Sequence, residues 1–203
     1  MILGHLFIIT AASGAGKTTL VKALLSQDAQ LTLSVSHTTR APRVGEVNGQ
    51  DYHFVSDAEF LAVLEQAGFL ESAQVHGARY GTSQAMVDAA LQAGRDVILE
   101  IDWQGAQQVR KLYPHAISIF VLPPSVAALE QRLNNRGQDS ADVIARRVNA
   151  ARDEMRHVVE FDYVTINDNF EVALQDLSAI IRTHRLKSSQ QLVRYQTLIQ
   201  QLT

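Results

Sequence analysis

The chain has 203 residues, enough for one domain with a sizeable core or for one domain with small insertions. Its 18 lysine and arginine residues are interspersed with 21 aspartate and glutamate residues, and a formal net charge of −3 gives no basic footprint, so we expect no nucleic-acid partner. Cysteine is absent, which excludes disulfides, thiolate metal sites and a cysteine nucleophile, and fits a reducing compartment.

The first twelve residues are mostly apolar, contain no lysine or arginine and run directly into a glycine-rich loop. A buried strand over Leu6–Thr10 therefore explains this segment better than a signal peptide does. The longest later apolar run, residues 116–122, has the length of a strand and not of a membrane span. We expect a cytoplasmic protein without a membrane partner.

Strand-like and helix-like segments alternate along most of the chain, which predicts an α/β fold with a parallel sheet. Residues 56–59 have the form of a capping box, and the helix that follows would end at Gly68. Thr82 or Ser83 begins another helix, which Gly94 would end. The expected strands are residues 6–10, 33–36, 96–101, 117–122 and 163–166, and the first helix is expected over residues 17–26.

Two segments interrupt this alternation. Residues 37–81 combine short strand-like pieces, several glycines and a cluster of tyrosine and arginine, which indicates a subdomain inserted into the core. Residues 125–157 are helical in composition and rich in arginine. The tail over residues 186–202 has apolar side chains at roughly helical spacing and could pack on the core or on another subunit, which leaves a homo-oligomer open. The chain is predicted to be a single domain whose core comprises residues 1–36, 82–124 and 158–203.

The stretch AASGAGKTT, residues 11–19, lies between the first expected strand and the first expected helix. Backbone N–H groups at a helix start point into one concavity that a phosphate can fill. Gly14 and Gly16 permit the sharp turn and the close approach that this requires. Lys17 is placed to bridge the phosphates, and Thr18 can offer its hydroxyl to Mg²⁺, partly through water.

This loop departs from the general pattern G-x-x-x-x-G-K-[ST] at one position, because Ala11 stands where the first glycine is expected. A methyl group is tolerated there if Ala11 keeps a negative φ. The alternative is a plain turn with a helix cap. The strand before the loop and the helix after it favour the phosphate loop.

The stretch SVSHTTRAPRVGEVNGQDYHF, residues 34–54, indicates a second phosphate site. Arg40 and Arg43 can each present a planar fork to a phosphate, and Tyr52 can add a phenolic donor. Two phosphate sites suggest a donor and an acceptor, which is typical of a kinase and not of a nucleotide switch.

Five further motifs follow along the chain: FLESAQVHGARYGTS at 69–83, ILEIDWQGAQQV at 98–109, FVLPPS at 120–125, RLNNRGQDS at 132–140 and TINDN at 165–169. With them, the sequence closely resembles the bacterial guanylate kinases, and the resemblance runs from the phosphate loop through TINDN. It implies an α/β P-loop core like that of nucleoside-monophosphate kinases, with a parallel sheet, a GMP-binding subdomain at about residues 37–81 and a helical lid at about residues 125–157.

For the acceptor, the resemblance implies that guanine is read near Glu71. Guanine presents N1–H and an exocyclic NH₂ side by side, which one carboxylate can accept together. Glu100 and Asp102 alternate on one strand and face the same side at its carboxyl end; the family usually has Asp at the position of Glu100. The implied GMP-binding residues are Ser36, Arg40, Arg43, Tyr52, Glu71, Tyr80, Thr82 and Asp102.

For the donor, the resemblance implies a lid that closes on the triphosphate. Arg132 and Arg136 are four residues apart on one face of an expected helix and, with Arg147, look like lid arginines. Arginines on a helix otherwise more often form a solvated face. The implied ATP-binding residues are Ser13, Gly14, Ala15, Gly16, Lys17, Thr18, Thr19, Arg132, Arg136 and Asn167, and the implied catalytic residues are Lys17, Arg43, Arg136 and Arg147.

The resemblance implies transfer of the γ-phosphoryl group from Mg·ATP to GMP, and also to dGMP, within purine nucleotide metabolism and recycling. Three other functions remain open: a P-loop switch or motor, a kinase for another small acceptor, and a peptide-binding module of the same fold. Such modules lack a working phosphate loop, whereas Gly16, Lys17 and Thr18 are present here. Tyr52 and Tyr80 could also be ordinary half-buried strand residues, and Glu71 the outward position of a strand.

Overall fold

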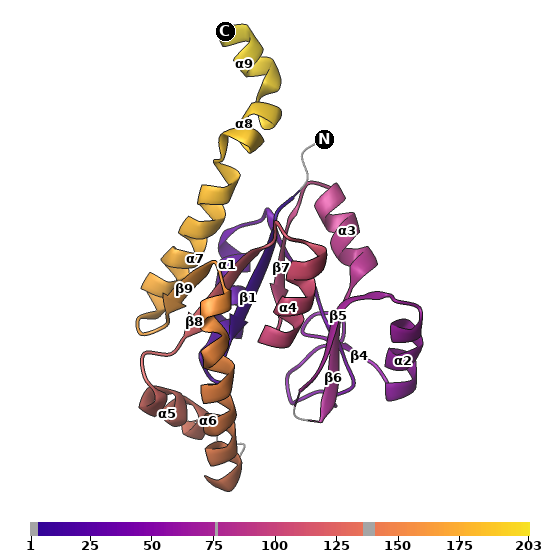
Figure 1. Ribbon diagram of the computed structural model, residues 1–203, viewed down its shortest axis with the longest axis vertical. Helices are drawn as coiled ribbons and strands as arrows, with labels where there is room; N and C mark the ends of the chain where they lie inside the picture. Colours follow the sequence, from indigo (N-terminus) through magenta and orange to yellow (C-terminus); the bar gives the residue numbers. More distant parts are fainter. Residues whose placement is uncertain (1–3, 76, 136–140) are drawn as a thin grey trace.

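The computed structural model describes residues 4–75, 77–135 and 141–203 and is built around a five-stranded sheet (Figure 1). All four strand pairings in this sheet are parallel, which confirms the predicted α/β fold with a parallel sheet. The strand order is β2 (Leu31–Leu33), β7 (Asp96–Glu100), β1 (Leu6–Ala11), β8 (Ile117–Leu122) and β9 (Tyr163–Ile166).

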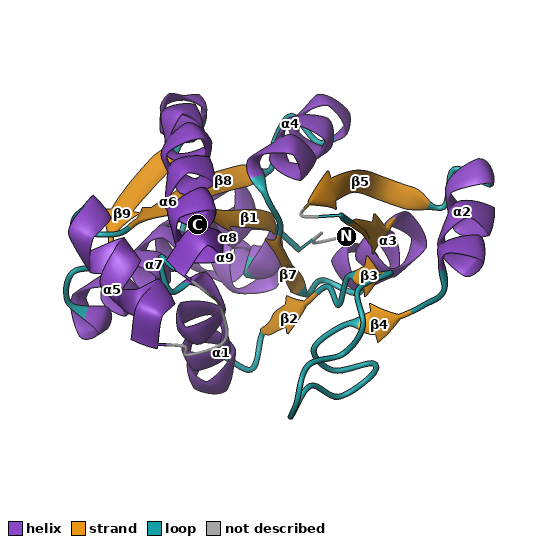
Figure 2. Cartoon of the chain, turned by 90° about the horizontal axis from the view of Figure 1, so that it is seen from below, coloured by secondary structure: helices purple, strands orange, loops and turns teal. Residues whose placement is uncertain are grey.

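Helices cover both faces of this sheet (Figure 2). Side chains alternate along β1, so that Phe7 and Ile9 pack against one layer of helices and Leu6 and Ile8 against the other. The first layer consists of α1 (Lys17–Gln27) and α7 (Phe170–Arg185), and the second of α3 (Gln84–Gln92) and α4 (Trp103–Leu112). Because both faces are buried, the strands are almost continuously apolar.

The strand expected over residues 33–36 begins and ends earlier than predicted. Ser34 still donates its N–H to the carbonyl of Ile98 in the main sheet, at 3.0 Å. The carbonyl of Ser36 instead accepts the N–H of His53, at 2.9 Å, and so belongs to a second sheet. The chain leaves one sheet for the other within this short stretch, which apolar pattern alone does not reveal.

The second sheet forms a subdomain beside the core. Its strand order is β4 (His53–Phe54), β3 (His37–Thr38), β6 (Ala78–Ser83) and β5 (Phe69–Val75). Helix α2 (Asp57–Glu65) begins with the predicted capping box of Ser56 and Glu59. It ends before Gly68, and Ala67 takes the left-handed conformation there, with φ at 50°.

Helices α5 (Val126–Asn135) and α6 (Ala141–Met155) form the arm that the sequence predicts as a lid. Their buried side chains pack on Ala12 of the glycine-rich loop, so this arm contacts the loop directly. A 3-10 turn, η1 (Arg156–Glu160), joins the arm to the core. There the ring of His157 stacks on Trp103 at the start of α4, with ring centroids 3.5 Å apart and planes 8° from parallel.

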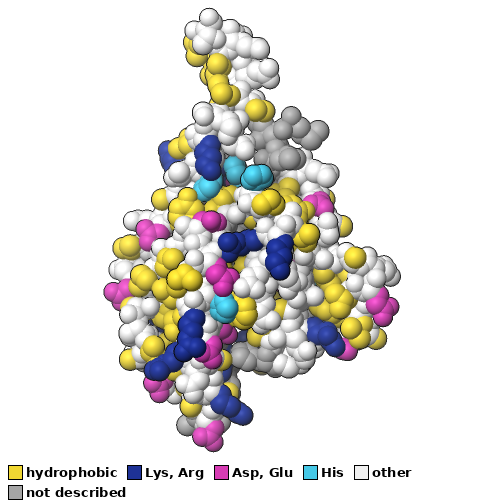
Figure 3. Space-filling model, in the orientation of Figure 1, with side chains coloured by type: hydrophobic (Ala, Val, Ile, Leu, Met, Phe, Trp, Pro, Cys, Tyr) yellow, Lys and Arg dark blue, Asp and Glu magenta, His cyan; other side chains and the backbone are white. Residues whose placement is uncertain are grey.

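The tail continues beyond α7 as two short helices, α8 (Ser188–Arg194) and α9 (Gln196–Leu202), and projects from the body of the molecule (Figures 1 and 3). Hydrophobic side chains are exposed along it, among them Leu192, Leu198 and Leu202. Within the described ranges, no helix is both long enough and apolar enough to cross a membrane.

Candidate functional site

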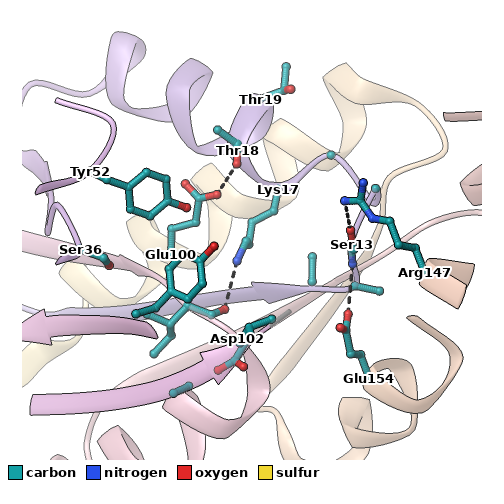
Figure 4. A pocket seen from close by; sticks show the side chains of 18 of the residues that line it. Ser13, Lys17, Thr18, Thr19, Ser36, Tyr52, Glu100, Asp102, Arg147 and Glu154 are labelled. Carbon is teal, nitrogen blue, oxygen red and sulfur yellow. Dashed lines mark hydrogen bonds between the residues drawn. The ribbon is translucent and has the colours of Figure 1, made fainter. Parts of the chain in front are cut away.

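A cavity of about 250 Å³ opens where β1 and β7 end, at the carboxyl edge of the parallel sheet. The glycine-rich loop, the second sheet and the arm of α5 and α6 all contribute to its wall (Figure 4). The predicted site residues that line it are Ser13, Gly14, Gly16, Lys17, Thr18, Thr19, Ser36, Arg43, Tyr52, Glu71, Tyr80, Asp102 and Arg147.

The glycine-rich loop has the backbone that phosphate binding requires. Gly14 and Gly16 have φ values of 90° and 95°, and Gly16 is the residue that caps α1. Ala11 is the last residue of β1, and among the described residues with a side chain only Ala67 has a positive φ. The predicted condition for tolerating alanine at position 11 is therefore confirmed.

Three predicted donor residues do not line the cavity, because they form or support the outer side of the loop. The carbonyl of Ala15 accepts Nδ2 of Asn167 at 2.8 Å and Nη1 of Arg132 at 3.3 Å. Arg132 also donates Nη2 to the carbonyl of Asn167, at 2.8 Å. A Cβ at Gly16 would lie 2.4 Å from Nδ2 of Asn167, so this close support also requires glycine.

On the cavity side, the loop meets the end of β7. Lys17 donates Nζ to the carbonyl of Ile101 at 3.1 Å, and both residues line the cavity. The hydroxyl of Thr18 donates to the carboxylate of Glu100. The side chain of Glu100, which is one methylene longer than the aspartate usual at this position in the family, therefore reaches the loop. Asp102 lines the same cavity.

This set of hydroxyl and carboxylate oxygens suits Mg²⁺, which prefers oxygen ligands and often shares them with substrate phosphates. Among the described residues, no three His, Cys, Asp or Glu side chains converge into a metal-binding group. Thr18 and Glu100 are the residues beside the loop that could hold a magnesium ion.

The arm contributes two charged side chains from α6. Arg147 donates Nη2 to Oγ of Ser13 at 2.8 Å, and the carboxylate of Glu154 accepts the backbone N–H of Ser13 at 3.1 Å. Glu154 lines the cavity, although no motif in the sequence pointed to it. Arg136, another predicted lid arginine, lies outside the described residues.

Glu71, which also lines the cavity, is a buried carboxyl group, 3 % exposed. Its Oε1 accepts the hydroxyl of Thr82 at 2.6 Å. Burial raises the pKa of Glu71 to about 7, and the charge of Asp102 acts in the same direction. Gly105 makes room for this group, because a Cβ there would lie 2.5 Å from Oε2 of Glu71. No motif in the sequence pointed to Gly105.

The aromatic and basic residues of the second sheet divide into two sets. Tyr52 and Tyr80 line the cavity with ring centroids 5.9 Å apart, and burial raises the pKa of Tyr52 to about 12. Arg40 does not line the cavity: it donates Nη2 and Nη1 to the carboxylate of Glu46 at 2.8 and 3.0 Å. This pairing raises the pKa of Arg40 and lowers that of Glu46.

Together, the parallel core, the phosphate loop and the second sheet across one cavity define a P-loop protein of the nucleoside-monophosphate-kinase class. The family model for guanylate kinase matches residues 4–184. A guanylate kinase of Methylobacillus flagellatus is 69% identical over 199 residues, 98% of each chain, and one of Dechloromonas aromatica is 55% identical with the same coverage. The crystal structure of guanylate kinase from Anaplasma phagocytophilum superimposes with a TM-score of 0.78 at 32% identity, and the match covers 92% of this chain and 89% of that one. The chain belongs to the guanylate kinase family.

Proposed function

We propose that the chain transfers the γ-phosphoryl group of Mg·ATP to GMP, giving ADP and GDP, with dGMP as a second acceptor. The observation that carries this assignment is one cavity lined both by a phosphate loop and by the buried carboxyl group of Glu71. A switch or motor has no need of a second binding group of this kind. Purine nucleotide recycling in the cytoplasm is the setting that these substrates imply.

In the donor half, the N–H groups of the loop and Lys17 bind the phosphates of ATP. Arg147 approaches from α6, on the side where charge develops during transfer. Arg136 is assigned to the same arm by family resemblance, while Arg132 and Asn167 support the loop through Ala15. When bound beside Thr18 and Glu100, Mg²⁺ supplies positive charge to the phosphate oxygens.

In the acceptor half, the ionised carboxylate of Glu71 accepts N1–H and the exocyclic NH₂ of guanine together. Thr82 holds that carboxylate in place, and Ser36 and Asp102 line the same part of the cavity. Arg43, Tyr52 and Tyr80 surround the position of the acceptor phosphate, and Arg40 joins them when the phosphate replaces Glu46 as its partner.

Transfer needs no general base, because the acceptor is a phosphate monoester whose second pKa, near 6, leaves it largely anionic at neutral pH. The chain's contribution is to place the two phosphates in line and to stabilise the charge that spreads over the transferred group. The arm of α5 and α6 would exclude water, which otherwise competes as an acceptor. A homo-oligomer remains part of the proposal and is supported by the exposed leucines of α8 and α9.

A coupled assay of ADP release tests the proposed function, with Mg·ATP and GMP, AMP, CMP, UMP or no acceptor. We expect turnover with GMP and little with the other acceptors. Hydrolysis without an acceptor would instead indicate a switch or motor. A folded protein with no turnover would indicate a binding module.

A further inference from the structure

The carboxylate of Glu154, from the predicted lid, contacts the phosphate loop. Glu154 is in the last turn of α6, and its Oε2 accepts the backbone N–H of Ser13 at 3.1 Å. Seven residues earlier on the same helix, Arg147 donates Nη2 to the hydroxyl of Ser13 at 2.8 Å. Residues seven apart lie on one face of a helix, so both contacts come from the same side of α6 (Figure 4).

The N–H groups of such a loop are oriented to bind the oxygens of an anion. A carboxylate oxygen offers the same negative charge and the same hydrogen-bond acceptor as a phosphate oxygen. We infer that Glu154 is an internal substitute for a donor phosphate oxygen, which holds the lid on the loop before ATP binds and which ATP displaces. This inference rests on the proposed donor site.

Its partner in the loop distinguishes Glu154 from the other acids nearby. Glu100 also lines the cavity, but it accepts the side-chain hydroxyl of Thr18 and not a backbone N–H. The adjacent Asp153 is 73 % exposed at its side chain and pairs with Arg156 at 3.1 Å, on the outside of α6. Glu154 lines the cavity and accepts a backbone N–H of the loop, so its carboxylate and the donor phosphates would compete for the same donor group.

This competition predicts in which direction the affinity for ATP changes when the charge of Glu154 is removed. A carboxylate left close to a bound triphosphate is repelled by it, so ATP binding must include the withdrawal of Glu154 from Ser13. The same movement of α6 would shift Arg147 relative to the loop, which links arrival of the donor to the position of a lid arginine. Removing the charge of Glu154 should therefore strengthen ATP binding, whereas damage to the fold would weaken it.

Titration calorimetry with Mg·ATP in the absence of GMP tests this inference on Glu154→Gln, which keeps the size of the side chain and an acceptor for the N–H of Ser13. We expect the dissociation constant of Mg·ATP to fall about 3–10-fold and that of GMP to stay unchanged. Asp153→Asn is the matched control: it removes the same charge from the same helix outside the cavity, and should change ATP affinity less than about twofold. Glu154→Ala should change ATP affinity in the same direction and replaces the glutamine variant if that does not fold.

Unchanged or weaker ATP binding in the folded Glu154 variants would overturn the inference, as would an equal gain in Asp153→Asn. Lys17→Ala, measured in the same way, distinguishes a wrong role for Glu154 from a wrong donor site. If Lys17→Ala weakens ATP binding but Glu154→Gln does not strengthen it, the donor site stands and the role of Glu154 is wrong. If Lys17→Ala leaves ATP binding unchanged, the donor site is misassigned and the inference fails with it.

Discussion

The donor and acceptor halves of the cavity are built in different ways. The donor half is centred on one contiguous loop between β1 and α1, whose backbone N–H groups are its main binding groups, with the side chains of Lys17 and, from α6, Arg147 added to them. The acceptor half uses side chains, and its residues lie between Ser36 and Asp102 on several short elements. A backbone site needs only the right residues in a row, whereas a side-chain site needs a fold that brings distant residues together.

The two halves also differ in how they are held. The donor loop is supported from behind by Asn167 and Arg132, and the sheet that carries it is buried on both faces. The outer loop of the acceptor half meets the core through an ion pair between Lys22 and Asp51, at 2.8 Å, in which Lys22 is largely exposed. Exposed ion pairs contribute little stability, so this contact holds the outer loop only weakly, whereas β5 is attached to α4 by Gln108, whose Nε2 donates to the carbonyl of Ser72 at 2.8 Å.

We expect the strongest loss of activity from a change confined to the donor half. Lys17→Ala removes the cation that lines the cavity and contacts the carbonyl of Ile101. We expect turnover to fall about 10²–10³-fold, because a charge that stabilises the transition state is lost. The dissociation constant of GMP, measured by calorimetry, should stay within about twofold, since the acceptor groups are on other elements. Loss of GMP binding would show that the two halves are misassigned.

A smaller effect is expected from the matching change in the acceptor half. Glu71→Gln keeps an acceptor for the hydroxyl of Thr82 but offers guanine an NH₂ group where one of its two donors needs an oxygen. GMP affinity should fall about 10–100-fold, the size of one or two charge-assisted hydrogen bonds. ATP affinity is the control and should not change. Equal weakening of both nucleotides would remove Glu71 from the base site.

The raised pKa of Glu71 makes the acceptor half dependent on pH. Burial sets this pKa at about 7, and guanine binds the ionised carboxylate, which is present above the pKa and lost as the pH falls below it. At pH 6 about a tenth of the protein would carry the ionised form, so GMP should bind about tenfold more weakly at pH 6 than at pH 8.

The phosphate of GMP also titrates near pH 6, and Glu71→Gln controls for it because the variant lacks the carboxyl group but binds the same ligand. The ratio of the two affinities across this pH range isolates the contribution of Glu71. A constant ratio would mean that Glu71 does not change its charge on binding GMP.

The phosphate loop can be predicted from its residues alone, whereas the guanine site needs the family resemblance, because only the loop is contiguous in the chain. In the donor half, strand, loop and helix are adjacent in the chain, so the motif and its context identify Lys17 and Thr18 without knowledge of the three-dimensional structure. In the acceptor half, the residues alone suggested a phosphate site at Arg40 and Arg43, and only family resemblance assigned guanine to Glu71. Contacts such as those of Gly105 and Glu154 depend on how helices pack across the cavity, and no local pattern records them.

The smallest expected effect concerns Ala11, where the donor motif itself is incomplete. Ala11 pairs with Val121 as part of β1 and packs against the core, so Ala11→Gly would restore the motif but remove a methyl contact and add freedom to the unfolded chain. We expect the free energy of unfolding to fall by about 0.5–1 kcal/mol, measured by urea denaturation, and the KM for ATP to stay unchanged. A clear gain in kcat/KM for ATP would show that the methyl group strains the loop. An unchanged value would mean that phosphate binding depends on the φ angles at Gly14 and Gly16, and that the first glycine of the motif is needed only where the strand before the loop cannot stay extended.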